Sequence, residues 1–125
     1  MKKMVFLVFL LLLSFFITGC SFDSYAETVK ESTKPKVSCS IEKQYSDEYG
    51  YSYYVEGKCT NNDNKDYDYL QVEFVCYDKD GTNLGTAMDN TNNLLKGQTW
   101  KFKAMSLYSD TKNTDHCDYH EASGW

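Results

Sequence analysis

The chain has 125 residues, of which 42% are hydrophobic and 16% aromatic, and its formal net charge is −5. It contains no arginine, and therefore lacks the guanidinium groups that bind phosphates and base edges in a bidentate way. An acidic chain of this kind is a poor partner for nucleic acid, and its length allows one small folded domain.

The N-terminal segment has the pattern of a signal peptide. Lys2 and Lys3 precede an apolar run of 14 residues, Met4 to Ile17, which only Ser14 interrupts. This run is shorter than the roughly 18 residues that a membrane-spanning helix requires. We therefore expect the first 19 residues to be removed on export.

The end of the apolar run carries a short motif, Ile17-Thr18-Gly19-Cys20. It resembles the lipobox of bacterial lipoproteins, in which a branched residue and two small residues precede a cysteine. The resemblance implies that the Cys20 thiol receives a diacylglyceryl group and becomes the mature N-terminus, on the extracytoplasmic face of the cell membrane. Ordinary secretion, with cleavage after Ser24-Tyr25-Ala26, is the alternative.

The number of cysteines agrees with lipidation. Five cysteines would leave one thiol unpaired in an exported protein. If Cys20 carries lipid, an even set remains, which consists of Cys39, Cys59, Cys76 and Cys117. Their gaps of 20, 17 and 41 residues do not match the paired C-x2–4-C spacing of a zinc site. We therefore expect two structural disulfides.

Residues 20–36 separate the cysteine motif from the folded part. They are polar, of mixed charge and without a hydrophobic period, and Pro35, the single proline of the chain, disfavours helix at their end. We expect a lipidated, flexible tether over residues 20–36 and one domain over residues 37–125.

The domain alternates apolar and polar residues in short runs. In the clearest run, Leu70, Val72, Phe74 and Cys76 share one face, and Asp80-Gly81 then provides a hairpin turn. We interpret this run as the central strand of an antiparallel sheet. The other expected strands lie at residues 37–42, 51–60, 82–88, 94–95, 100–105 and 117–119. Seven short strands predict a β-sandwich of two sheets, and an open β-barrel is the alternative.

Three short motifs follow one another between Val55 and Met105. They are V-x-G-x-C-x-N at residues 55–61, F-V-C-Y-D at 74–78 and G-x-x-W-x-F at 97–102. Together they resemble the FxLYD domain, a small Ig-like β module found largely on exported lipoproteins of Gram-positive bacteria. The resemblance implies an Ig-like fold and supplies no catalytic residues. Cys76 departs from the motif leucine, and Cys59 from an apolar position.

The disulfide pairing follows in part from this resemblance. If residues 46–52 form a hairpin loop, Cys39 and Cys59 lie on facing strands at nearly the same level. The implied Ig-like topology places Cys76 and Cys117 in the other sheet. We predict the pairs Cys39–Cys59 and Cys76–Cys117, and the other two pairings of four cysteines remain open.

Candidate metal ligands occur in the loops and the last strand. Residues 62–73 and 78–83 are rich in oxygen ligands, but neither segment has the full glycine and glutamate pattern of an EF-hand, so a nonstandard calcium loop is the alternative to a solvated turn. His116 and His120 would be about 13 Å apart on a strand, too far for one ion. We predict that these histidines and Asp118 are surface residues, with no metal and no cofactor.

Eleven tyrosines are the remaining compositional signal. Tyr54, Tyr67 and Tyr69 lie opposite the buried faces of their strands, and we predict that they form an exposed binding surface. No catalytic motif is present in the sequence. We predict a lipid-anchored interaction module, not an enzyme, with an unknown envelope or extracellular partner. The alternatives are a carbohydrate or small-ligand binder that uses the tyrosine face, and a surface lipoprotein that excludes phage.

Overall fold

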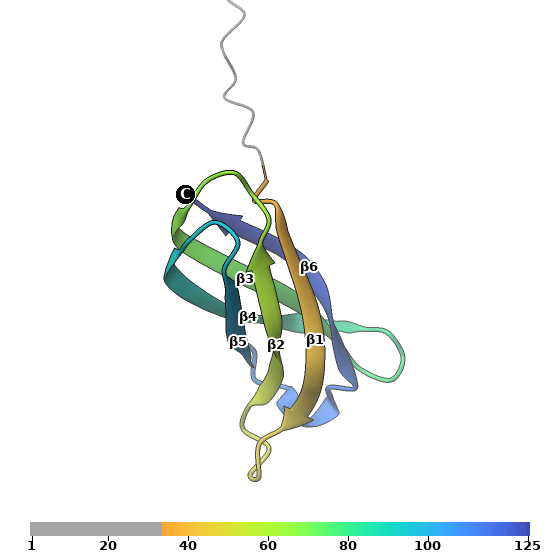
Figure 1. Ribbon diagram of the computed structural model, residues 1–125. Coiled ribbons are helices and arrows are strands. Elements are labelled where there is room, and N and C mark those ends of the chain that lie inside the picture. The colour runs from red at the N-terminus through yellow and green to blue at the C-terminus, as the bar shows by residue number, and fades with distance from the viewer. Residues whose placement is uncertain (1–33) are drawn as a thin grey trace, which may run out of the picture. The chain divides into compact units, whose positions relative to one another are not determined.

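The computed structural model describes residues 34–125, which form antiparallel strands connected by turns (Figure 1). The strands are β1 (Val37–Ser46), β2 (Tyr53–Asn61), β3 (Tyr67–Tyr77), β4 (Asn83–Leu94), β5 (Thr99–Ser106) and β6 (His116–Gly124). One turn of 3-10 helix, η2 (Thr111–Asn113), precedes β6, and no helix in these residues is long and apolar enough to cross a bilayer. The predicted signal peptide, Cys20 and residues 20–33 of the predicted tether lie outside the described residues.

All six strands belong to one sheet, in the order β1-β2-β5-β4-β3-β6. The join between β4 and β5 is short, because only Ala87 with Ser106 and Met88 with Met105 are paired there. The other neighbours pair along most of their lengths. The sheet curls at this join, so that a β1-β2-β5 half and a β4-β3-β6 half enclose the core (Figure 1).

The predicted central strand is confirmed in β3, which pairs with β4 on one side and β6 on the other. The predicted Leu70, Val72, Phe74 and Cys76 are all buried. Alternation produces this result because successive side chains of a strand point to opposite faces. The polar residues between them remain on the outer face.

The main core is formed by residues of both halves. Phe74 of β3 lies against Phe102 of β5, with ring centroids 5.1 Å apart. Gly57 of β2 allows this packing, since a Cβ there would lie 1.9 Å from the Ser40 carbonyl oxygen and 2.8 Å from Cζ of Phe102. A side chain at residue 57 would therefore force β1 and the Phe102 ring apart.

The number of strands differs from the prediction. The segments expected as two short strands, at residues 82–88 and 94–95, fall largely within the single strand β4, because the polar residues between them pair with β3 from Tyr69 to Val72. Backbone hydrogen bonding does not require apolar side chains. Six strands in one curled sheet replace the expected seven in two sheets. The Ig-like sandwich is not confirmed, and the curled sheet is closer to the open-barrel alternative.

Hydrogen bonds of one side chain, that of Gln44, join the two edge strands. A bulge in β1 leaves Glu42 without a partner between the pairs Ile41–Gly57 and Lys43–Glu56, so Gln44 turns toward the interior opposite buried Val55. Its Nε2 donates to the Cys117 carbonyl at 2.9 Å, and its Oε1 accepts from the Cys117 N–H at 2.7 Å. One amide side chain thus makes the two hydrogen bonds that a neighbouring strand would make.

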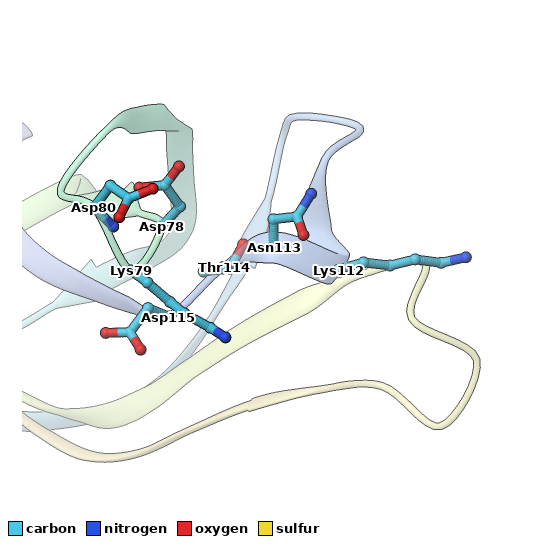
Figure 2. Close-up of a pocket in the computed structure, with 7 residues that line it drawn as sticks. All are labelled: Asp78, Lys79, Asp80, Lys112, Asn113, Thr114 and Asp115. Carbon is cyan, nitrogen blue, oxygen red and sulfur yellow. The ribbon is translucent and has the colours of Figure 1, made fainter.

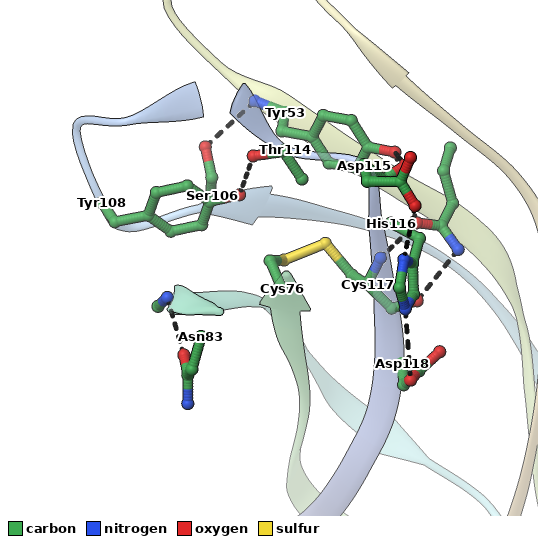
Figure 3. Close-up of a disulfide and its surroundings, with 12 residues drawn as sticks. Tyr53, Cys76, Asn83, Ser106, Tyr108, Thr114, Asp115, His116, Cys117 and Asp118 are labelled. Carbon is green, nitrogen blue, oxygen red and sulfur yellow. Dashed lines mark hydrogen bonds and ion pairs between the residues drawn. A yellow bond between two sulfur atoms is a disulfide. The ribbon is translucent and has the colours of Figure 1, made fainter. Parts of the chain in front are cut away.

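Both predicted disulfides are present. Cys39 of β1 is bonded to Cys59 of β2, and Cys76 of β3 is bonded to Cys117 of β6. In each pair the two residues are direct partners in the sheet, with Cα atoms 4.1 Å and 3.9 Å apart. Figure 3 shows the second disulfide beside the start of β6. Each half of the curled sheet therefore contains one crosslink.

Candidate functional site

The predicted tyrosine surface does not assemble. Tyr54 lies on β2 in one half of the sheet, and Tyr69 lies on β3 in the other half. Tyr67 is only 1% exposed, so its predicted place on an open face is wrong. The alternation breaks at this end of β3, where Tyr67 and Leu70 are both buried although they are three residues apart. The Tyr67 ring packs with Leu94 and Ala122 in a small second core.

The outer face around Tyr54 is dominated by charged neighbours. The Tyr54 ring lies 5.5 Å from that of Tyr45, and Lys103 Nζ lies 4.5 Å from its centroid. Beside it, Lys43 Nζ is 3.1 Å from a Glu56 carboxylate oxygen. Hydrogen bonds from Tyr45 and then from Lys43 lower the pKa of Glu56. This part of the β1-β2-β5 face is occupied by its own ion pair and cation–π contacts.

A row of polar side chains follows the outer face of β3. The Tyr69 hydroxyl donates to Gln71 Oε1 at 2.8 Å, and Gln71 Nε2 donates to Glu73 Oε1 at 3.0 Å. Trp125 stacks on Tyr69 with ring centroids 4.6 Å apart, and is itself 70% exposed. The row therefore joins an aromatic stack at one end to a carboxylate at the other.

A bulge in β6 brings two more ligand-type side chains to the end of this row. The pairing passes from Phe74–Tyr119 to Glu73–Glu121, which leaves His120 as the extra residue. His120 and Glu121 both lie on the outer side as a result, beside Glu73. One ligand atom from each of these three residues lies within 4.8 Å of the other two.

Sequence reasoning missed this cluster, because it placed His120 with His116 on one face of a regular strand. In the structure the two histidines have different neighbours, and only His120 lies beside Glu73. His116 pairs with Tyr77, four residues along β3 from Glu73, or about 13 Å at the usual rise of a strand. The available signal was the spacing of the less polar residues in the sequence, which changes from two residues, Cys117 to Tyr119, to three residues, Tyr119 to Ala122.

His116 lies between two carboxylates at the start of β6 (Figure 3). Its Nδ1 is 2.8 Å from an Asp115 oxygen, and its Nε2 is 3.6 Å from an Asp118 oxygen. The hydrogen bond with Asp115, and then the nearby charge of Asp118, raise the pKa of His116 above its ordinary value. The predicted surface position of His116 and Asp118 agrees with this arrangement.

An open pocket of about 360 Å³ lies between the β3–β4 turn and the segment before β6 (Figure 2). Its lining includes Asp78, Asp80 and Asp115 together with Lys79 and Lys112. Asp78 Oδ1 already accepts the N–H groups of Asp80 and of Thr82, each at 2.9 Å, so this oxygen stabilises the turn. The lining is mainly polar and includes both carboxylates and lysines.

Comparison with models of known protein families, with curated proteins and with solved structures returns no match for this chain.

Proposed function

We infer that the chain is a lipid-anchored, extracytoplasmic interaction module without catalytic activity. The distribution of the five cysteines carries this proposal. Four form the disulfides Cys39–Cys59 and Cys76–Cys117, and the fifth is Cys20 in the lipobox-like motif. Disulfides persist in oxidising compartments, so the pairing supports export, and the motif accounts for the one cysteine outside the described residues.

The FxLYD-type assignment is part of this proposal. Its support is that the motif positions gather in one place. The ring of Phe74 lies against Phe102, Trp100 is edge-on to Phe102 at 6.1 Å, and Gly57 faces the same ring. Contact between three motifs that are separate in the sequence is what a shared structural module requires.

The surface that we assign to a protein partner is the outer face of β3 and β6. It carries the Tyr69–Trp125 stack, and Gln71 and Glu73 continue along the same strand. Exposed aromatic side chains beside polar ones are typical of binding surfaces, since each ring offers apolar area with a polar edge.

Cell fractionation of wild type and of a Cys20→Ser variant tests the anchor. We expect wild type in the membrane fraction and the variant in the soluble extracytoplasmic or secreted fraction, because about two acyl chains are needed for stable anchoring. An Ala26→Leu variant is the matched control, since it blocks the alternative cleavage site and should remain in the membrane. Release of wild type, or loss of export on blocking Ala26, would contradict the lipobox.

Chemical cross-linking on intact cells that express the native chain tests the interaction. We expect one recurrent protein partner, which a Tyr69→Ala variant loses and a Tyr54→Ala variant keeps, because Tyr54 lies on the other half of the sheet. If wild type captures no protein above background, or if only the Tyr54 variant loses the partner, the proposed protein-binding surface is wrong.

A second candidate function is carbohydrate binding, which the Tyr69–Trp125 stack favours. The exposed Trp125 ring offers an apolar face, and the Gln71 amide lies two residues along β3 from Tyr69. Aromatic faces with adjacent hydrogen-bonding groups suit sugar rings. A glycan array with wild type and the Trp125→Ala variant tests it: retained binding by the variant, or no binding by wild type, counts against this function.

A further inference from the structure

We propose that Glu73, His120 and Glu121 form a binding site for a zinc ion on the outer face of β3 and β6. The proposal is independent of the proposed function, which requires no metal. It also goes beyond the prediction from sequence, which considered His116 with His120 and expected no metal.

The register of the strands places the three side chains together. Glu73 and Glu121 are direct cross-strand partners, and the bulge at His120 adds a third ligand beside them. Without the bulge, His120 and Glu121 would point to opposite faces of the sheet. Bulges redirect side chains in this way at functional sites. Both elements are regular strands on either side of the bulge, so the backbone that carries the ligands is well fixed by hydrogen bonds.

The donor set fits zinc. One imidazole nitrogen and two carboxylate oxygens are ordinary zinc ligands, and three protein ligands leave a fourth position for water or a partner group. The ligand atoms lie within 4.8 Å of one another, whereas ligands of a tetrahedral zinc ion are roughly 3.4 Å apart. Small side-chain rotations of these surface residues close that difference. A hard ion such as calcium prefers six or more oxygens, which this set does not supply.

The surroundings also favour a cation. Two carboxylates directly opposite each other on paired strands repel. Within residues 34–125, neither Glu73 nor Glu121 forms an ion pair with a lysine or histidine, in contrast to Glu56, which pairs with Lys43. A bound divalent ion would neutralise both charges at the point where the sheet brings them together.

The Gln71 side chain would support the site from outside the ligand set. Its Nε2 donates to Glu73 Oε1, and its own oxygen accepts from the Tyr69 hydroxyl. This chain of hydrogen bonds orients one carboxylate oxygen and leaves the other free for the metal. Partners that orient a ligand in this way typically change metal affinity by about 10- to 100-fold.

Titration calorimetry with zinc chloride, on the full chain in detergent and in chelator-free buffer, tests the site. We expect one zinc ion per chain. Glu73→Gln and His120→Gln should each weaken binding by at least about tenfold, since each removes one of three ligands. His116→Gln is the matched control, because it removes the other histidine of the same strand, and it should bind as wild type does.

Several outcomes would overturn the proposal. These are no binding by wild type at millimolar zinc, equal weakening by His116→Gln, or calcium competing as well as zinc does. X-ray absorption of the zinc-bound wild type gives a second measurement that depends on no variant. One imidazole with oxygen ligands supports the site, whereas sulfur ligands or two imidazoles would show that zinc binds elsewhere.

Discussion

His116 shows how a single residue is set by its immediate neighbours. It is held between Asp115 and Asp118, and its ring lies 5.5 Å from that of Tyr77. Because the folded state raises its pKa, the charged imidazolium is favoured more strongly in the folded chain than in the unfolded chain. The stabilisation is fully present below the ordinary histidine pKa of about 6.5, and is lost as pH rises through the higher folded value.

The first prediction concerns this dependence on pH. We expect wild type to exceed His116→Gln in free energy of unfolding at about pH 5.5, and the difference to vanish at about pH 8.5. Urea titrations at both pH values measure it. Asp115→Asn should likewise lower the free energy of unfolding more at about pH 5.5 than at about pH 8.5, since it removes the largest cause of the raised pKa of His116. A difference that is independent of pH would contradict this account.

Tyr67 carries a second prediction at this scale. Burial of the side chain, and then the hydrogen bond to Asp63, raise its pKa to about 12. Ultraviolet titration of the native chain should therefore show a late tyrosine ionisation that is missing from Tyr67→Phe. The variant should also lose about 1 kcal/mol of stability with the hydrogen bond. An unchanged titration curve in Tyr67→Phe would assign the late ionisation to another tyrosine.

Single-residue environments were the least predictable part of the chain. Beyond the bulges at Glu42 and His120, the residues that face inward are those that simple alternation would place outward. No residue type in the sequence marks either bulge. Gln44 therefore turns inward and Glu121 turns outward against the simple alternation. Tyr67 was expected on the surface for the same reason, because alternation was extended past the point where the strand becomes irregular.

At the scale of elements, the sequence predicted most strands, but it divided β4 in two and did not predict how the strands assemble. The inward-facing residues of β3 were expected because alternation depends only on neighbours in the sequence. The short β4–β5 join depends on contacts between residues far apart in the chain, such as Met88 with Met105. The polar stretch of β4 was expected to be a break, because hydrogen bonding to β3 leaves no trace in hydropathy.

A prediction at this scale concerns the contact between the edge strands. Gln44→Ala removes both hydrogen bonds to the Cys117 backbone, and should lower the free energy of unfolding by about 2 kcal/mol. Hydrogen exchange at the Cys117 amide should become faster. Lys43→Ala, the matched control next in sequence, removes a surface ion pair with Glu56 and a cation–π contact with Tyr45, and should have a smaller effect. Equal effects of the two variants would contradict a special role for Gln44.

At the scale of the whole molecule, the two crosslinks and the proposed anchor divide the five cysteines. The Cys39–Cys59 bond closes a loop with a sequence separation of 20, and Cys76–Cys117 closes one of 41. Their pairing could be expected from the sequence once facing strands and the resemblance were considered together. The partner of the proposed module could not be predicted from the sequence, because a binding surface of mixed polar and aromatic residues resembles an ordinary strand surface.

Removing the disulfides gives a prediction for global stability. Replacing Cys39 and Cys59 by alanine should cost about 3 kcal/mol, and replacing Cys76 and Cys117 about 4 kcal/mol, because the longer loop restricts the unfolded chain more. Denaturant titration in one detergent measures both. Cys20→Ala is the control, and should leave the free energy of unfolding unchanged. A lower free energy of unfolding for Cys20→Ala, or an unchanged one for the two double variants, would contradict this division of roles.

The most direct test of the central claim is the intact mass of the unreduced chain isolated from cell membranes. A lipid-anchored, exported module predicts a chain that begins at Cys20 and carries a diacylglyceryl group, with its other four cysteines oxidised in two disulfides. An unmodified chain that begins after Ala26, an uncleaved chain that still contains the first 19 residues, or free thiols at Cys76 and Cys117 would contradict it.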